Sequence, residues 1–287
     1  MYLSEYDITN PVTATLVASE RITPLNWEAE VRHLVLQLPQ GAELDFVEGQ
    51  SIGVLAPGPH AFGNKHHLRL YSIASSRKGE AGKENTFSIC VRRCFYLDEI
   101  SGEQYPGVAS NFLCDARPGD PVQVTGPYGA HFSVPADDTS NMLMVGVGTG
   151  IAPFRAFVRH IYEERGGWRG KVRLFYGAKS GMELLYRNEH NKDMALYYDD
   201  ASFRAFEAVS PRPAFDHPPA LDNLLLQHRE EIWEMVDDPK TYIFVAGLEN
   251  AKAKFDKAMI AIAGSEQAWQ NRRADLQASG RYAELIY

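Results

Sequence analysis

Apolar and polar residues alternate in short runs through the first 138 residues, which is the pattern of half-buried β-strands. Gly, Pro, Asp and Asn separate the runs. Strands this short and closely spaced predict a barrel or a sandwich, and in the order of the chain they read VTATLVASE, VRHLVLQL, SIGVLAP, LRLYSIASS, TFSICVRR and DPVQVTGP. One helix is expected in this half, at 108–115.

After residues 137–141 the pattern changes to apolar strands that alternate with amphipathic helices. A continuous apolar strand, MLMVGVG, precedes a segment at 152–165 with helical spacing of its apolar residues. Alternating strands and helices predict a parallel sheet built from βαβ units. The further elements expected are strands at 171–178, 203–209 and 241–247, and helices at 182–195, 220–236 and 250–263. We therefore expect two domains, at 1–138 and 139–287.

Composition narrows the classes of function. The net charge of −8 argues against a nucleic acid as the main partner. There is no run of 18 apolar residues, so no transmembrane span is expected. Three cysteines without metal-ligand spacing fit a reducing, cytoplasmic location and exclude an iron–sulfur cluster held by cysteines alone.

Two short segments carry candidate chemistry. LRLYSIASS places Arg69, Tyr71 and Ser72 on one predicted strand, within a locally basic stretch at 60–93 of an otherwise acidic half. GVGTGIAPF places glycines between a buried strand and a helix, where a backbone turn can approach an anion. Those glycines lack the spacing of the usual dinucleotide fingerprint, so both a phosphate turn and a simple strand–helix turn remain open.

Several motifs, taken in order, resemble those of plant-type ferredoxin–NADP⁺ reductases. They are LRLYSIASS (68–76), SICVRR (88–93), GVASNFLCDARPGD (107–120), VTGPYG (124–129), GVGTGIAPFRAF (146–157), LLY (184–186), VAGL (245–248) and the final Tyr287. The resemblance covers nearly the whole chain. It implies a two-domain fold, in which an antiparallel β-barrel FAD-binding domain is followed by an α/β parallel-sheet nucleotide-binding domain.

The same resemblance implies a set of cofactor-binding residues. Arg69 would bind the FAD pyrophosphate, Tyr71 would stack on the isoalloxazine ring, and Ser72 would point at flavin N5. Tyr96 would stack on the adenine, and Arg92 would bind the pyrophosphate of the nicotinamide nucleotide. The remaining members of the implied set are Leu70, Cys90, Val91, Val108, Ala109, Ser110, Gly148, Thr149 and Gly150.

At the C-terminus, Tyr287 would cover the flavin face opposite Tyr71 and move aside for the nicotinamide. Two further positions depart from the family. Ala246 stands where a cysteine is usual, so slower hydride transfer or altered nicotinamide binding is expected. Leu285 stands where the tail glutamate is usual, and Glu284 is the nearby candidate for the proton relay, with a solvated tail carboxylate as the other interpretation.

The segment that would bind the 2′-phosphate of NADP(H) departs further. Ser210 is kept, Pro211 replaces the expected arginine, and Arg212 lies one place later. The later basic and tyrosine places fall near Pro218 and Ala220. A 2′-phosphate needs charge-assisted hydrogen bonds. We therefore expect NADP(H) as the nucleotide, with a weak preference over NAD(H) that depends on Arg212.

The resemblance implies an FAD-dependent oxidoreductase that exchanges electrons between NADP(H) and a one-electron carrier such as ferredoxin or flavodoxin. Ser72, Tyr287 and Glu284 are its candidate catalytic residues, and the basic stretch at 60–93 would steer an acidic carrier. Two alternatives remain open. The chain could be the reductase component of an oxygenase, or a flavoprotein that has lost turnover and acts as a binding or regulatory subunit.

Overall fold

The structure is a computed structural model that describes residues 5–58, 66–129, 131–188, 193–197, 201–209 and 220–287. The chain forms two compact units, Met1–Ala130 (unit 1) and His131–Tyr287 (unit 2). The domain boundary predicted at residue 138 thus lies inside unit 2. There the ring of Phe132 packs against Phe154, Phe157 and Phe244, which are residues of the second predicted domain.

Unit 1 is an antiparallel six-stranded sheet in the order β4-β3-β8-β1-β2-β5. Its strands are β1 (Val12–Arg21), β2 (Val31–Gln37), β3 (Ser51–Pro57), β4 (His66–Ser72), β5 (Thr86–Arg92) and β8 (Pro121–Tyr128). A separate hairpin, β6 (Phe95–Leu97) and β7 (Gln104–Pro106), precedes helix α1 (Val108–Asp115). All six predicted strands and the predicted helix are present, and the antiparallel fold class is confirmed.

Because side chains alternate along a strand, each strand turns one row of apolar side chains toward the inner face of the sheet. The buried core gathers Leu16, Leu34, Ile52, Phe87 and Val124, which come from five different strands, and Leu113 of α1 joins them. Burying aliphatic and aromatic side chains in this way supplies most of the stabilisation of such a unit.

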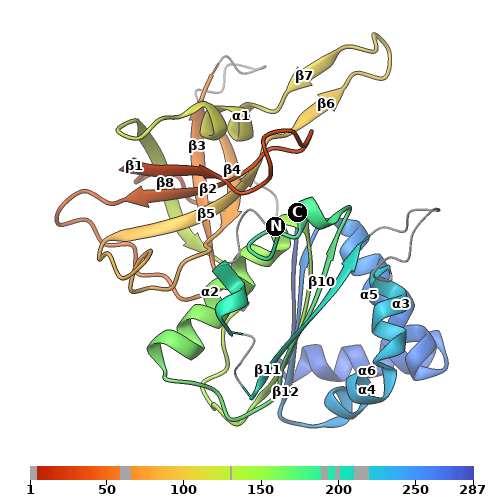
Figure 1. Cartoon of the computed structure of the whole chain (residues 1–287). Helices are drawn as coiled ribbons and strands as arrows, with labels where there is room; N and C mark the ends of the chain where they lie inside the picture. The colour runs from red at the N-terminus through yellow and green to blue at the C-terminus, as the bar shows by residue number, and fades with distance from the viewer. Residues whose placement is uncertain (1–4, 59–65, 130, 189–192, 198–200, 210–219) are drawn as a thin grey trace. The chain divides into compact units, whose positions relative to one another are not determined.

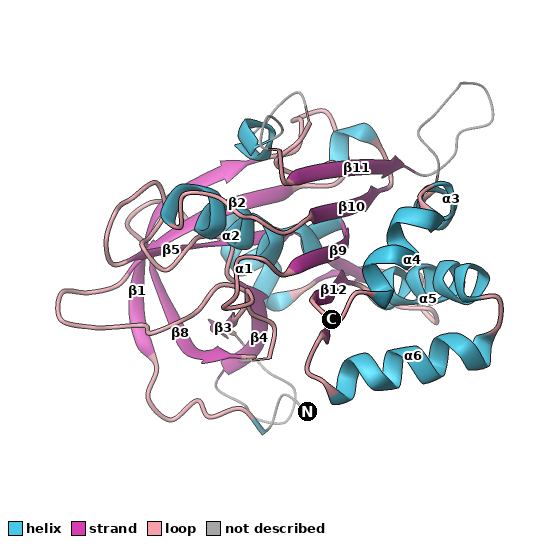
Figure 2. Cartoon of the chain, turned by 90° about the horizontal axis from the view of Figure 1, so that it is seen from below, coloured by secondary structure: helices cyan, strands magenta, loops and turns pink. Residues whose placement is uncertain are grey.

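Unit 2 is a parallel five-stranded sheet in the order β11-β10-β9-β12-β13, and Figure 2 shows β11, β10, β9 and β12 side by side. The strands are β9 (Asn141–Val147), β10 (Val172–Ala178), β11 (Phe203–Val209), β12 (Thr241–Gly247) and β13 (Tyr282–Ile286). The helices are α2 (Ala152–Arg159), α3 (Leu221–Gln227), α4 (Arg229–Asp237), α5 (Glu249–Ala263) and α6 (Glu266–Ala278). Shorter helical turns are η3 (Gly148–Ile151), η4 (His160–Glu164), η5 (Gly181–Glu183) and η6 (Asp193–Tyr197).

Helices cover both faces of this sheet (Figure 1). On one face Phe157 of α2 packs against Phe244 of β12 and against Phe154 of its own helix. On the other face α3 to α6 bury a cluster that includes Val245, Phe255 and Trp269. Consecutive residues of β12 therefore serve opposite faces, as expected for a strand buried on both sides. The predicted parallel α/β fold class is confirmed.

Two helix predictions are wrong. Where one helix was expected at 182–195, the described residues form η5, η6 and a turn, because Tyr186 takes a left-handed φ of 61°. Its neighbours Leu184 and Leu185 are also buried. Three consecutive buried residues do not share one face of a helix, so they do not fit an amphipathic helix. The helix expected at 220–236 is divided into α3 and α4 at His228, whose backbone leaves the helical region. Among the described residues, no helix has the length and apolar character needed to span a bilayer.

Candidate functional site

The closure of the unit 1 sheet brings two of the predicted cofactor motifs together. Strands β4 and β5 are the two ends of the sheet order. They meet through an antiparallel bridge between Ile73 and Ile89, and the Ala74 N–H donates to the Ser88 carbonyl at 2.7 Å. The bridge joins the two edges of the sheet, which therefore closes into a barrel, and the carboxyl end of β4 meets β5.

Arg69 and Tyr71 lie two residues apart on β4 and therefore point to the same face of the strand. The Arg69 side chain is exposed, and its Nη1 donates to the Leu68 carbonyl at 2.8 Å. Tyr71 packs at the edge of the barrel core, and burial raises the pKa of its phenol, so the ring stays neutral at physiological pH. Leu70 is half-buried, and Ser72, with 9% of its surface exposed, closes the strand.

Cys90 and Val91 on β5 are buried, whereas Arg92 at the end of the strand is partly exposed. Cys90 takes part in no disulfide. The three residues pair with β2 in regular register, so their backbone positions are fixed by the sheet. A partly exposed guanidinium at the end of β5 is suited to a phosphate that approaches from solvent.

The β6–β7 hairpin presents a pair of tyrosines. Tyr96 and Tyr105 are cross-strand partners, and their rings stack with centroids 5.3 Å apart at an interplanar angle of 21°. Tyr96 is 60% exposed, so one face of this pair is open to a flat aromatic ligand.

Helix α1 begins at Val108 with Gly107 as its N-cap, which supplies no side-chain cap. Its first turn contains no acidic residue, so the helix N-terminus suits an anion. Ala109 is buried and Val108 is exposed. Ser110 is also buried, and its hydroxyl accepts from the Cys94 N–H at 3.1 Å and lies 3.3 Å from the Gly107 carbonyl. Any phosphate bound here would therefore mainly use backbone N–H groups.

An ion-paired brace holds α1 against β5, and it was not predicted from the sequence. Arg93 donates to Glu30 at 2.7 Å, to Asn111 at 2.8 Å and to Asp115 at 2.7 Å. Asn111 in turn donates to the Cys94 and Gly107 carbonyls. The consecutive arginines at 92 and 93 were a usable signal, because neighbours in a strand point to opposite faces and cannot share one ligand.

In unit 2 the predicted glycine-rich turn lies at the carboxyl end of β9. The strand order reverses direction at β9, and this is where open α/β sheets bind their ligands. Gly148 has a left-handed φ of 58°. A Cβ on Gly150 would lie 2.3 Å from the Ala246 carbonyl, so only glycine fits there. The turn therefore packs directly on the backbone of β12, and Thr149 stands between the two glycines.

The tail of the chain ends beside this turn. Strand β13 pairs with β12, and the Tyr287 N–H donates to the Gly247 carbonyl at 3.2 Å. The Tyr287 and Thr149 hydroxyls are 2.9 Å apart. The final ring is 50% exposed within reach of the turn. Its place over the flavin stays a prediction.

Glu284 lies on the other side of this strand from Leu285. Its Oε1 accepts from the Tyr282 hydroxyl at 2.8 Å and pairs with Lys252 of α5 at 3.2 Å. In the β12–β13 register, Glu284 lies opposite Val245 and Leu285 lies opposite Ala246. The proton-relay role of Glu284 stays a prediction, and the geometry gives its carboxylate a structural partner on α5. Ser210 and Arg212 lie outside the described residues.

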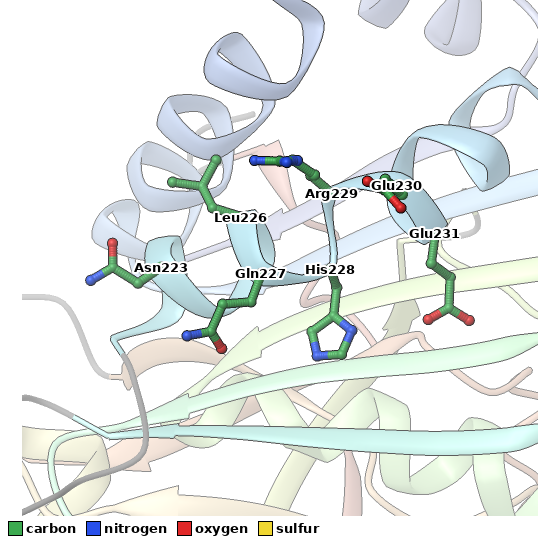
Figure 3. Close-up of a pocket in the computed structure, with 7 residues that line it drawn as sticks. All are labelled: Asn223, Leu226, Gln227, His228, Arg229, Glu230 and Glu231. Carbon is green, nitrogen blue, oxygen red and sulfur yellow. The ribbon is translucent and has the colours of Figure 1, made fainter.

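A groove of about 730 Å³ lies at the junction of α3 and α4 (Figure 3). His228 lies at this junction, with its ring 4.1 Å from that of Phe206. The groove contains none of the predicted site residues, so we assign it no part in the chemistry.

Comparisons with known proteins agree with the division of the chain into two units. Residues 16–132 match the family model described as an oxidoreductase FAD-binding domain, and residues 144–257 match the oxidoreductase NAD-binding domain. The fold and the two sites thus define a flavin- and nicotinamide-dependent oxidoreductase of two domains.

Relatives specify the family. The chain is 34% identical to the ferredoxin–NADP reductase of Thermosynechococcus vestitus over 289 residues, which cover 98% of this chain and 74% of that protein. It is 33% identical to the chloroplastic leaf isozyme 1 of Oryza sativa subsp. indica over 290 residues, 99% of this chain and 79% of that protein. The chain therefore belongs to the ferredoxin–NADP reductase family.

A solved structure shares the fold. The ferredoxin–NADP⁺ reductase of Plasmodium falciparum, determined with 2′P-AMP, superimposes with a TM-score of 0.72 at 18% identity. The superposition covers 99% of this chain and 98% of that one.

Proposed function

We propose that the protein is an FAD-dependent enzyme that transfers electrons between NADP(H) and a one-electron carrier protein, ferredoxin or flavodoxin. The observation that supports this proposal is the closure of the barrel, which joins the carboxyl end of β4, with Tyr71 and Ser72, to β5, with Cys90, Val91 and Arg92. Bound FAD would accept hydride from the nicotinamide and pass on single electrons, while the chain binds and orients both ligands.

The residues of unit 1 fit FAD. The exposed Arg69 guanidinium and the uncapped N-terminus of α1 are the groups to neutralise its pyrophosphate. The neutral Tyr71 ring would stack on the isoalloxazine and exclude water. The Ser72 hydroxyl would donate to, or accept from, the flavin at N5. Tyr96, whose ring stacks on Tyr105, would stack on the adenine.

The residues of unit 2 fit the nicotinamide nucleotide. The turn at Gly148–Gly150 would let its backbone approach the ligand closely, with Thr149 beside the nicotinamide. Arg92 is the residue that the family resemblance assigns to the pyrophosphate of this nucleotide. Tyr287 would leave the nicotinamide's place when the nucleotide binds. Of the candidate proton-handling groups, Ser72 is favoured over Glu284, because the Glu284 carboxylate is paired with Lys252.

Nucleotide choice rests on Ser210 and Arg212, and we propose NADP(H) with NAD(H) as a weaker substrate. Arg212→Ala tests this, with the ratio of kcat/KM for NADPH over NADH as the measurement. Losing one charge-assisted contact should lower the ratio by about tenfold. A ratio of several hundred that survives the substitution would show that another residue binds the 2′-phosphate.

The carrier would meet a smaller basic surface than the sequence indicated. Arg77 is paired with the buried Glu48, and Arg93 belongs to the α1 brace. Lys78 and Lys83 are exposed and remain to steer an acidic carrier. The double substitution Lys78→Glu and Lys83→Glu should raise the KM for ferredoxin and leave the reduction of ferricyanide by NADPH unchanged.

The test of function is a stopped-flow experiment on the purified flavoprotein. NADPH should reduce the flavin, and the reduced protein should then reduce ferredoxin or flavodoxin. Flavin reduction without transfer to either carrier would favour a dedicated oxygenase partner. We also propose a cytoplasmic location, which the three free cysteines support, and cell fractionation would test it.

A further inference from the structure

Tyr176 joins two loops of unit 2 through a buried hydroxyl group. Its neighbour Phe175 belongs to the core cluster with α3 to α6, so Tyr176 points to the opposite face of the sheet. The side chain is fully buried. Its hydroxyl is 2.9 Å from the Gly148 carbonyl and 3.3 Å from the Glu183 carbonyl, and the Leu185 N–H donates to it at 3.2 Å.

These contacts use the phenol both as a donor and as an acceptor. A tyrosine hydroxyl has one proton to donate and can accept from a neighbouring N–H. Here the proton goes to Gly148, the nearer carbonyl, and Leu185 supplies the accepted bond. Because the site is buried, no solvent replaces these partners if the oxygen is removed. The hydroxyl therefore ties the loop after β9 to the loop after β10.

The loop after β9 is the glycine-rich turn of the proposed nucleotide site. The turn requires a left-handed φ at Gly148, and Gly150 packs directly against the Ala246 carbonyl. Thr149, between them, reaches the Tyr287 hydroxyl at 2.9 Å. Tyr176 thus contacts the turn at Gly148 and β12 contacts it at Gly150, so Thr149 lies between two fixed positions.

We propose that Tyr176 is a positioning residue for the nicotinamide nucleotide. Its hydroxyl fixes the Gly148 carbonyl, and through it the place of Thr149 relative to Tyr287. This inference rests on the proposed function, since it concerns the nucleotide that the turn would bind. A residue that only filled the core would need the phenyl ring and not the oxygen.

The test is Tyr176→Phe, which keeps the ring and removes only the oxygen. Tyr162→Phe is the matched control, because it removes another hydroxyl of unit 2 that is hydrogen-bonded, to Ser202 at 2.8 Å, away from the turn. For each variant, FAD affinity, the urea midpoint of unfolding, NADP⁺ affinity and the rate of flavin reduction by NADPH are measured. Tyr176→Phe should keep the FAD affinity and weaken NADP⁺ binding by about threefold to tenfold relative to the control, with slower flavin reduction.

Two results would overturn the inference without touching the proposed function. In the first, NADPH reduces the flavin of the wild-type protein, but Tyr176→Phe equals the control variant in NADP⁺ affinity and in the rate of flavin reduction. The second result comes from amide hydrogen exchange of the wild-type protein. This measurement tests the inference even if the variant does not fold. NADP⁺ should slow exchange in 148–150 and 183–185 together, and an effect confined to 148–150 would contradict the link. Wild-type protein that neither binds nor oxidises the nucleotide would instead refute the proposed function.

Discussion

Strand β4 of unit 1 and the glycine-rich turn of unit 2 would bind their proposed ligands in opposite ways. On β4 the groups proposed to contact the ligand are side chains, and the Arg69 guanidinium donates to the neighbouring Leu68 carbonyl. In the turn the group proposed to contact the ligand is the backbone, which is held by the Tyr176 hydroxyl and by the close approach of Gly150 to Ala246, while Tyr287 contacts the Thr149 side chain.

This difference predicts which substitutions should impair each site most. A side-chain site loses one contact when one residue is truncated, so its losses should be graded. A backbone site depends on the path of the chain, so a small added group should be more damaging than the loss of a large one.

Adding one methyl group to the turn should have the largest effect. Gly150→Ala would place a Cβ 2.3 Å from the Ala246 carbonyl, and backbone atoms cannot yield cheaply. We expect NADP⁺ affinity or the rate of flavin reduction to fall by about a hundredfold, because a displacement near 1 Å can cost that much. FAD content should persist. Gly181→Ala is the control, since nothing lies within 4 Å of its Cβ; equal activity of the two variants would contradict a backbone site.

Truncating the flavin-strand arginine should have the next largest effect. Arg69→Ala removes charge-assisted hydrogen bonds to the FAD pyrophosphate, which should weaken FAD binding by about tenfold to a hundredfold. Fluorescence titration of the apoprotein with FAD measures this, with the exposed Arg117→Ala as control. If the two variants bind FAD alike, Arg69 does not contact the phosphates.

Removing the adenine platform should have a smaller and more selective effect. Tyr96→Ala should weaken FAD binding by about fivefold or more, which is the usual range for stacking on a base. FMN, which has no adenine, serves as the internal control and should bind the variant as it binds the wild type. A parallel loss for FMN would mean that the hairpin supports the fold and not the adenine.

Acid sensitivity of the α1 brace should be the smallest effect. Burial raises the pKa of the Glu30 carboxyl, but hydrogen bonds from Arg93 and Arg32 outweigh it and leave that pKa below its usual value. The ionised group therefore stabilises the folded state above the unfolded pKa of about 4.3, and this contribution is lost as the pH falls through the lower folded value. The urea midpoints of wild type and Glu30→Gln should converge below about pH 4. Glu43→Gln, at an exposed site, should track the wild type throughout.

Much of the fold was predictable because alternation and apolar spacing are local properties of the sequence. The strands of the barrel, the parallel sheet and the turn at 148–150 all follow from them. The exposed hairpin at 95–106 was missed because its strands are only three residues long and lack a buried face. The break at His228 and the left-handed Tyr186 were missed because tertiary packing, not local propensity, decides them.

The residues of the candidate site also differ in how far the sequence alone could predict them. Residues carried by motifs, such as Arg69 and Gly150, could be named from the sequence. Tyr176 could not, because its partners are backbone groups, and for Arg93 the sequence offered the arginine pair at 92 and 93 but not the partner Glu30, which is distant in the chain. The positions of Glu284 and Leu285 required the register of β13, which the sequence alone did not supply.

The most direct test of the central claim is one anaerobic absorbance titration of the purified protein. The account predicts flavin bands that belong to FAD, either on purification or after FAD is added, and their bleaching by NADPH. Absent flavin bands after FAD addition, or FAD bands that neither NADPH nor NADH bleaches, would contradict it.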